Sequence, residues 1–131
     1  ARGETMEEYF TRMYAPPAHV ALLLGNRNAD DAILYRGRGD IMLTGRNNVA
    51  ACGVGLGLEL LTNPEKLLDP IVSARASAWF FKTHSHHDAT HLRGLIPDLC
   101  RDRDWESVRR AVNGGLNGYP EFLTLVEALA E

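Results

Sequence analysis

The sequence predicts a mainly helical fold. Apolar side chains recur at spacings of three and four residues in several segments, as they do on the buried face of an amphipathic helix. Proline follows asparagine or aspartate at Asn63-Pro64 and Asp69-Pro70, and proline at the first helical position is a common helix start. An Asn-Gly-Gly run at residues 113–115 gives a helix stop. We therefore expect helices joined by long polar loops.

The first helix is predicted over residues 4–14, and the proline pair at residues 16–17 ends it. Residues 18–24 are apolar and fit either a helical turn or a short strand. Residues 25–31 are polar and are predicted to form a loop. The residues that recur at helical spacing in the first helix are Met6, Tyr9, Phe10 and Met13.

The middle of the chain carries three helical predictions. Residues 47–61 have helical character, although glycine interrupts them three times. A short helix begins at Pro64, with Glu65 in its first turn. A longer helix begins at Pro70 and runs to about Lys82. The buried face predicted for this longer helix holds Ile71, Ala74, Ala78 and Phe81.

The last third is predicted to contain one long loop and two helices. Residues 84–102 are polar and are predicted to be mostly loop. Asp104 is suited to cap a helix over residues 105–112, and residues 113–115 end that helix. A final helix starts at Pro120. Its apolar stripe consists of Phe122, Leu123, Val126 and Leu129.

The totals fit one soluble domain, residues 1–131, long enough to bury a core. The net charge of −3 gives no basic footprint for a nucleic acid. No apolar run approaches the roughly 20 residues of a membrane span, and no signal-peptide pattern is present. The chain starts at Ala1, which favours a processed or trimmed product. Cys52 and Cys100 are too few for a disulfide framework and are expected to be reduced thiols in the core.

Glycines and arginines are concentrated in residues 35–48, which read Tyr-Arg-Gly-Arg-Gly-Asp-Ile-Met-Leu-Thr-Gly-Arg-Asn-Asn. Glycine allows a backbone to approach a ligand closely. Arginine, threonine and asparagine supply directional hydrogen-bond donors and acceptors. This mixture suits the wall of a ligand-binding cleft better than a core.

This segment resembles the pattern Y-R-G-R-G-x-I-Q-L-T-G-R-x-N-Y of glycoside hydrolase family 19, which includes chitinases and phage endolysins. The chain departs from the pattern at Met42, where the family has glutamine, and at Val49, where it has an aromatic residue. Further segments resemble family motifs in the same order, so the resemblance covers most of the chain and is specific. These segments are residues 24–26 with Asp31, residues 60–68, residues 77–81 and residues 108–118.

The resemblance implies a lysozyme-like, mainly helical fold and inverting hydrolysis of the β-1,4 linkages of chitin or peptidoglycan. Inversion needs a carboxylic acid to protonate the leaving oxygen and a carboxylate to activate water, about 6.5–9.5 Å apart. The short motifs resemble the compact phage and bacterial branch more than the cysteine-rich plant chitinases. Peptidoglycan is therefore the preferred substrate. No cofactor is implied.

The resemblance also assigns candidate site residues. Thr44 matches the hydroxyl residue that helps to hold the attacking water, and Asn48 and Asn113 match amides that bond to substrate or to a catalytic carboxylate. For each of these three, the alternative is a polar side chain that stabilises a loop. Tyr35 and Arg36 are candidate substrate-binding residues. Arg36 and Arg38 could instead pin the loop through carboxylate pairs, and this interpretation is favoured for the two arginines.

One part of the family pattern is missing. The family places its general acid in an H-E-[TS]-x-G motif on a helix upstream of all the matched segments, and this sequence has no such motif. We therefore expect the latter portion of the domain, without the upstream catalytic helix, and an open face through which the chain can associate. Among the early acids Glu4, Glu7 and Glu8, Glu8 is a weak candidate for the second carboxylate. The alternative is that all three lie on a solvated helix face.

Residues 84–91 hold four of the five histidines. They imitate the H-x-H-x-D-H zinc motif of metallo-β-lactamase-fold hydrolases, but Ala89 stands where the last histidine should be. His87 and His91 have the i, i+4 spacing of zinc ligands on a helix, yet structural loop histidines are the favoured interpretation and no metal is expected.

Three functions follow from the sequence. The favoured one is a glycan hydrolase that acts on the cell wall. The others are a non-catalytic relative that binds glycan or a protein partner, and a zinc-binding module formed by residues 84–91.

Overall fold

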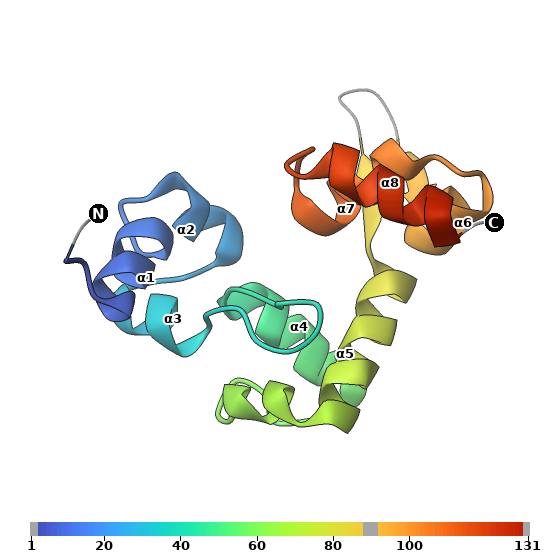
Figure 1. Cartoon of the computed structure of the whole chain (residues 1–131). Coiled ribbons are helices and arrows are strands. Elements are labelled where there is room, and N and C mark those ends of the chain that lie inside the picture. Colours follow the sequence, from blue (N-terminus) through green and yellow to red (C-terminus); the bar gives the residue numbers. More distant parts are fainter. Residues whose placement is uncertain (1–2, 88–91, 130–131) are drawn as a thin grey trace. The chain divides into compact units, whose positions relative to one another are not determined.

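The computed structural model describes residues 3–87 and 92–129, which are mostly helical. The prediction of a mainly α fold is therefore confirmed (Figure 1). The internal contacts divide the chain into two compact units, Ala1–Trp79 and Phe80–Glu131, and each unit is described by itself. The assignment of residues 1–131 to a single domain stays a prediction.

The first unit opens with helices α1 (Met6–Tyr14) and α2 (His19–Leu24). Thr5 and Glu8 form a capping box at the start of α1: the Thr5 hydroxyl accepts from the Glu8 N–H, and the Glu8 carboxylate accepts from the Thr5 N–H. The helix ends at Ala15, before the predicted proline stop. The ambiguous apolar segment is thus a helix.

Helix α3 (Ala29–Leu34) lies partly where the sequence predicted a loop, so that prediction is wrong for residues 29–31. Asn28 caps α3, because its side-chain oxygen accepts from the Asp31 N–H at 2.9 Å. The helix is short, and its apolar positions are too few to produce a periodic signal.

Helix α4 (Arg46–Leu56) is followed by the 3₁₀ helix η1 (Pro64–Leu68) and by α5 (Pro70–Thr83). All three elements were predicted, but the predicted helix over residues 47–61 is wrong at its end, because the left-handed Gly57 caps α4 after Leu56. The predicted buried face of α5 is wrong, however, because Ile71 is 72% exposed and Phe81 is 39% exposed. The buried face instead carries Ser73, Ala76 and Phe80. Both sets have helical spacing, so periodicity alone did not distinguish them.

The second unit contains an antiparallel pair, β1 (Ser85–His87) and β2 (Leu92–Leu95), followed by α6 (Ile96–Arg101). These elements correct the prediction of a mostly unstructured segment at residues 84–102. Ile96 donates its N–H to the His84 carbonyl at 3.2 Å and thereby closes the hairpin against the start of α6.

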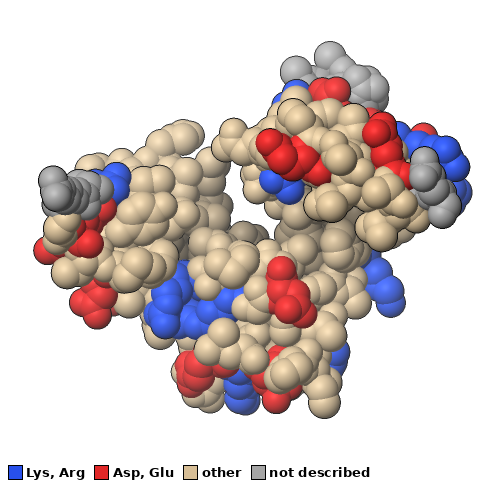
Figure 2. All heavy atoms as spheres, viewed as in Figure 1, with Lys and Arg blue, Asp and Glu red and all other residues tan. Residues whose placement is uncertain are grey.

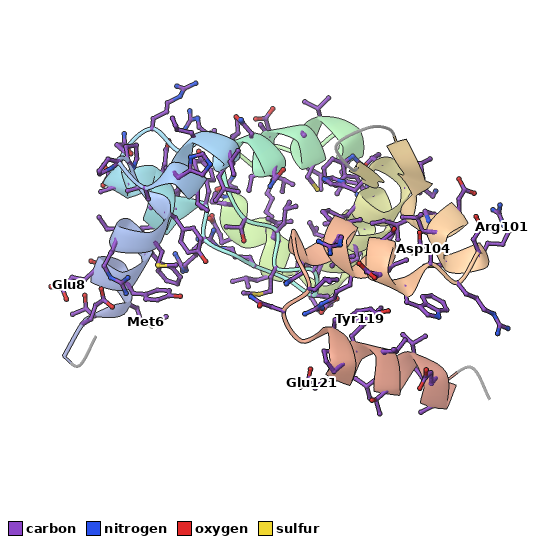
Figure 3. All side chains as sticks on the ribbon, turned by 90° about the horizontal axis from the view of Figure 1, so that it is seen from above. Met6, Glu8, Arg101, Asp104, Tyr119 and Glu121 are labelled. Atoms are coloured by element: carbon purple, nitrogen blue, oxygen red, sulfur yellow. The ribbon has the colours of Figure 1, made fainter. Side chains whose placement is uncertain are left out.

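Helices α7 (Trp105–Asn113) and α8 (Tyr119–Leu129) complete the second unit, close to their predicted positions. The Asp104 carboxylate caps α7 by accepting from the Ser107 N–H at 3.2 Å, and Figure 3 shows Asp104 at the start of this helix. The predicted apolar stripe of α8 is only partly covered, since Phe122, Leu123 and Val126 are half-buried and Leu129 is exposed.

Each unit has its own small core. The buried apolar residues of the first unit include Ala21, Ala32, Val49, Cys52, Leu60, Leu67 and Ala76, and those of the second are Phe80, Ile96, Leu99 and Val108. Both cysteines are free thiols, as predicted, with Cys52 buried and Cys100 half-buried. Among the described residues, no helix is long and apolar enough to cross a membrane.

Candidate functional site

A buried polar network holds the start of α4 against α3. The Arg46 guanidinium donates to the Asp31 carboxylate at 3.0 Å, and the Arg46 N–H donates to the Asn26 side-chain oxygen at 3.0 Å. The Asn26 amide donates in turn to the Tyr14 carbonyl at the end of α1, at 2.9 Å. The Asp31 carboxylate also accepts from the Arg27 N–H at 2.9 Å. The 35–48 segment is therefore anchored at its C-terminal end.

Replacing Arg46 with methionine is expected to lower the free energy of unfolding by about 2 kcal/mol, because Asp31 is 5% exposed and would lose its charged partner. The Arg27 N–H, which still donates to the Asp31 carboxylate, limits the loss. Urea unfolding measures it, with Arg27→Met as the matched control, since the Arg27 side chain is exposed. Equal losses in the two variants would contradict this role for the pair.

Tyr35, at the start of the segment, is 3% exposed. Its hydroxyl donates to the Leu61 carbonyl at 3.1 Å, and the Arg46 guanidinium lies 5.4 Å from its ring centroid. These contacts give Tyr35 a supporting role. Its role as a substrate-binding residue therefore stays a prediction, and its burial does not favour it.

Arg38 is a buried cation held by backbone carbonyls. Its guanidinium donates to the carbonyls of Leu34 and Arg36, at the C-terminal end of α3, where the helix dipole favours positive charge. Burial, reinforced by the nearby Arg36, lowers the pKa of Arg38. Among the described residues its Nε has no hydrogen-bond partner. Hydrogen bonds to backbone carbonyls therefore hold the start of the 35–48 segment in place. Arg38 makes more of these bonds than Arg36 does.

Residues 38–43 form a tight reversal. Arg38 pairs with Leu43 in an antiparallel bridge, and the Asp40 N–H donates to the Ser73 hydroxyl of α5 at 2.8 Å. Gly39 lies at the contact with φ +76°, and a Cβ built on it would be 2.8 Å from the Leu67 carbonyl oxygen. Only glycine combines this left-handed backbone with so close an approach. Met42, in place of the family's glutamine, has φ 53° and is 61% exposed.

The Thr44 hydroxyl already donates its proton within its own loop. Its Oγ1 donates to the Met42 carbonyl at 2.8 Å, so its lone pairs remain as acceptors. The Asn48 side-chain amide donates to the Thr44 carbonyl at 2.8 Å and fixes this peptide against the first turn of α4. A Cβ built on Gly37 would lie 3.0 Å from Thr44 Oγ1 and 2.9 Å from Met42 Cε, so the missing side chain of Gly37 makes room for both.

A groove of about 430 Å³ lies beside this segment. We call it the α1–α3 groove; its lining residues are Met6, Glu7, Phe10, Ile33, Arg36 and Gly37. Gly37 thus borders both the groove and the Thr44 hydroxyl. Arg36, Thr44 and Asn48 all lie on this segment. Glu7 is the early acid that lines the groove, whereas the sequence favoured Glu8 among the three early acids.

Comparison with known proteins decides the family. A family model described as "Chitinase class I" matches residues 9–100. This chain belongs to glycoside hydrolase family 19. A glycosyl hydrolase family 19 domain-containing protein of Haemophilus influenzae is 32% identical over 106 residues, which cover 80% of this chain and 46% of that protein.

Two further similarities complete the comparison. The inactive chitinase-like protein 1 of Hevea brasiliensis is 44% identical over 50 residues, 37% of this chain and 16% of that protein. The crystal structure of chitinase C from Streptomyces griseus HUT6037 aligns with a TM-score of 0.58 at 21% identity, over 85% of this chain and 41% of that one. This alignment confirms the predicted lysozyme-like fold of the family. The chain spans less than half the length of these relatives.

The early acids of this family 19 chain differ in their surroundings. Glu8, the predicted weak candidate for a catalytic carboxylate, is engaged in the capping box, and Figure 3 shows it on the first turn of α1 beside Met6. Glu4 receives two bonds from the Arg12 guanidinium, at 2.7 and 2.9 Å, which lower the pKa of Glu4 to about 2. Only Glu7 lines the groove. The capping geometry gives Glu8 a structural role.

The other predicted site residues belong to the second unit. Asn113 is exposed at the last position of α7, and it is described with that unit alone. In the predicted zinc segment, the His84 ring stacks on Phe80 at 3.8 Å, and burial lowers the pKa of His84. His91 lies outside the described residues. Within the described part of the chain, no group of three or more histidine, cysteine or carboxylate side chains is placed to hold a metal, so the zinc hypothesis stays a prediction.

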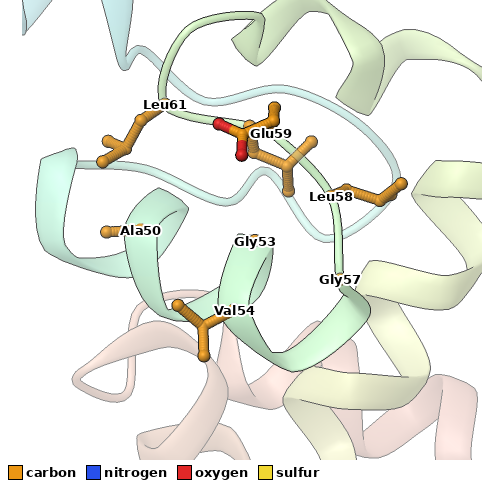
Figure 4. A pocket seen from close by; sticks show the side chains of 8 residues that line it. Ala50, Gly53, Val54, Gly57, Leu58, Glu59 and Leu61 are labelled. Atoms are coloured by element: carbon orange, nitrogen blue, oxygen red, sulfur yellow. The ribbon is translucent and has the colours of Figure 1, made fainter.

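A second pocket of the first unit, of about 380 Å³, contains none of the predicted site residues. It lies between α4 and the following segment, and Figure 4 shows the Glu59 carboxylate among mostly small and apolar neighbours. Acidic and basic side chains are interspersed over the face drawn in Figure 2, without a continuous basic band on that face.

Proposed function

We propose that the chain forms part of the substrate-binding wall of a β-1,4-glycan hydrolase that acts on peptidoglycan, with chitin as the chemically related alternative. The family includes chitinases, and the bacterial relative matches 80% of the chain. The observation that carries the proposal is the position of Thr44. Its hydroxyl adjoins Gly37, which lines the α1–α3 groove, and keeps free acceptor lone pairs.

In this proposal Thr44 holds the attacking water. Because the hydroxyl proton is committed to the Met42 carbonyl, Oγ1 must accept a hydrogen bond from the water rather than donate one. That bond directs a lone pair of the water toward the anomeric carbon. Asn48 supports this geometry by fixing the Thr44 carbonyl. Arg36 contributes contacts to substrate, and the assignment of Asn113, in the second unit, as a substrate contact stays a separate prediction.

Inversion requires two carboxyl groups about 6.5–9.5 Å apart, one as acid and one as base. We assign both to the part of the domain outside the segment matched here, as the family pattern implies. Glu8 is the weak candidate within the chain, and its bond to the Thr5 N–H would have to break before it could act as a base.

The test is release of reducing ends from peptidoglycan and from chitin by the full-length gene product, with NMR detection of the first-formed anomer. We expect release from peptidoglycan and an inverted anomer. Release of the retained anomer would contradict the inverting mechanism. If neither polymer releases reducing ends, the proposal that the protein is a hydrolase is wrong.

A second candidate is a non-catalytic glycan-binding relative. Two observations favour it: the capping role of Glu8, and the similarity to a plant protein named as an inactive chitinase-like protein. It predicts glycan binding without release of reducing ends, which the same assay separates from the first candidate.

A further inference from the structure

The α1–α3 groove carries two opposite charges over an apolar lining. Met6, Phe10 and Ile33 supply the apolar surface, while Glu7 and Arg36 supply the charges. Arg36 donates to the Ile33 carbonyl at 2.9 Å, which orients its guanidinium. In the described part of the chain, neither Glu7 nor Arg36 forms a salt bridge with a neighbouring side chain. Both charges therefore remain available to a ligand.

An uncharged sugar chain can hydrogen-bond to both groups, but it neutralises neither charge. A ligand that matches the groove carries a carboxylate for Arg36, a cationic amine for Glu7, and small apolar groups for the lining. The stem peptide of peptidoglycan has all three, because it contains free carboxylates, a diamino acid and alanine methyl groups. Chitin has no peptide.

We propose that the α1–α3 groove binds the stem peptide of peptidoglycan. The inference rests on the proposed function, since the peptide reaches the groove while its sugar lies at Thr44. Gly37 provides the continuity: it lines the groove, and a Cβ on it would be 3.0 Å from Thr44 Oγ1. A peptide that leaves a sugar at Thr44 therefore has the groove immediately beside it.

The test compares two soluble probes by calorimetry. One is the disaccharide of N-acetylglucosamine and N-acetylmuramic acid carrying the tetrapeptide, and the other is the same disaccharide with its lactyl carboxyl capped as a methylamide. We expect the peptide to improve affinity about tenfold, in line with two charge-assisted hydrogen bonds made at an exposed site. Equal affinity for the two probes would overturn the inference.

Variants locate the effect. Arg36→Gln and Glu7→Gln should each reduce the affinity ratio at least about threefold, whereas Arg27→Gln and Glu59→Gln, which remove exposed charges elsewhere in the first unit, should leave the ratio unchanged. Glu7→Gln decides the matter if Arg36→Gln does not fold. An unchanged ratio in the groove variants would overturn the assignment to this groove.

The outcomes remain separate from the proposed function. If the protein releases reducing ends from peptide-free glycan but binds both probes equally, the hydrolase proposal is supported and the proposal of peptide binding in the groove is wrong. If the protein binds the peptide probe more tightly but releases no reducing ends, the proposal of peptide binding is supported and the hydrolase proposal is wrong.

Discussion

Replacing Thr44 with valine is expected to lower kcat for reducing-end release about 100-fold in the full-length gene product, with KM changed less than about threefold. Valine keeps the shape of threonine but removes the oxygen that we assign to the attacking water. Among the described residues the hydroxyl has one hydrogen-bond partner, the Met42 carbonyl. The main effect of removing it is therefore expected where the attacking water must be oriented in the transition state.

The matched control is Thr44→Ser, which keeps the hydroxyl and should retain activity within about threefold of the parent. Steady-state kinetics on peptidoglycan measures both variants. If serine lowers kcat as much as valine does, keeping the hydroxyl does not preserve activity, and the proposed role of Thr44 is wrong.

Replacing Gly39 with alanine is expected to lower the free energy of unfolding by at least about 3 kcal/mol. Two penalties combine at this position. The left-handed backbone, with φ +76°, disfavours any Cβ, and the new methyl would lie 2.8 Å from the Leu67 carbonyl oxygen and 2.9 Å from Ser73 Oγ. Residues 38–43 would have to move away from α5, and the hydrogen bond between the Asp40 N–H and the Ser73 hydroxyl would then be lost.

Gly57→Ala separates the two penalties. Gly57 has φ +68°, but a Cβ built there meets nothing within 4 Å. Gly57→Ala should therefore lower the free energy of unfolding only by the cost of a left-handed backbone, about 1 kcal/mol. Chemical denaturation of both variants measures the difference. Equal losses would mean that the contact between Gly39 and Leu67 contributes nothing to stability.

The sequence was most informative where a local signal has one structural meaning. Proline after Asn63 and after Asp69 predicted the starts of η1 and α5, and the Asp104 cap predicted α7. The motif at residues 35–48 predicted the family, which the comparisons confirm.

Where several interpretations were physically equivalent, the sequence was insufficient. Helix α5 is apolar on more than one side, so two stripes with helical spacing competed, and tertiary packing selected the one with Ala76 and Phe80. Helix α3 and the β1–β2 hairpin are too short to produce a periodic pattern, although Asn28 was a usable capping signal.

The candidate site shows the same division. The order Thr5-x-x-Glu8 is the capping-box signature, and it already indicated a structural role for Glu8. By contrast, nothing local distinguished Glu7 from the neighbouring acids, because its place in the groove depends on how α1 packs against α3. Likewise, the choice of carbonyls rather than carboxylates as partners of Arg38 is set by the end of α3, and residue types alone did not reveal it.

The central claim is that residues 35–48 bind glycan beside the α1–α3 groove. The most direct measurement is NMR chemical-shift mapping of a β-1,4-linked N-acetylglucosamine tetramer titrated into the ¹⁵N-labelled 131-residue chain. We predict saturable shifts for the amides of Gly37, Thr44 and Asn48, and little change for Gly57 in the second pocket. Shifts confined to that pocket, or no shifts at Gly37 and Thr44 at millimolar tetramer, would contradict the account.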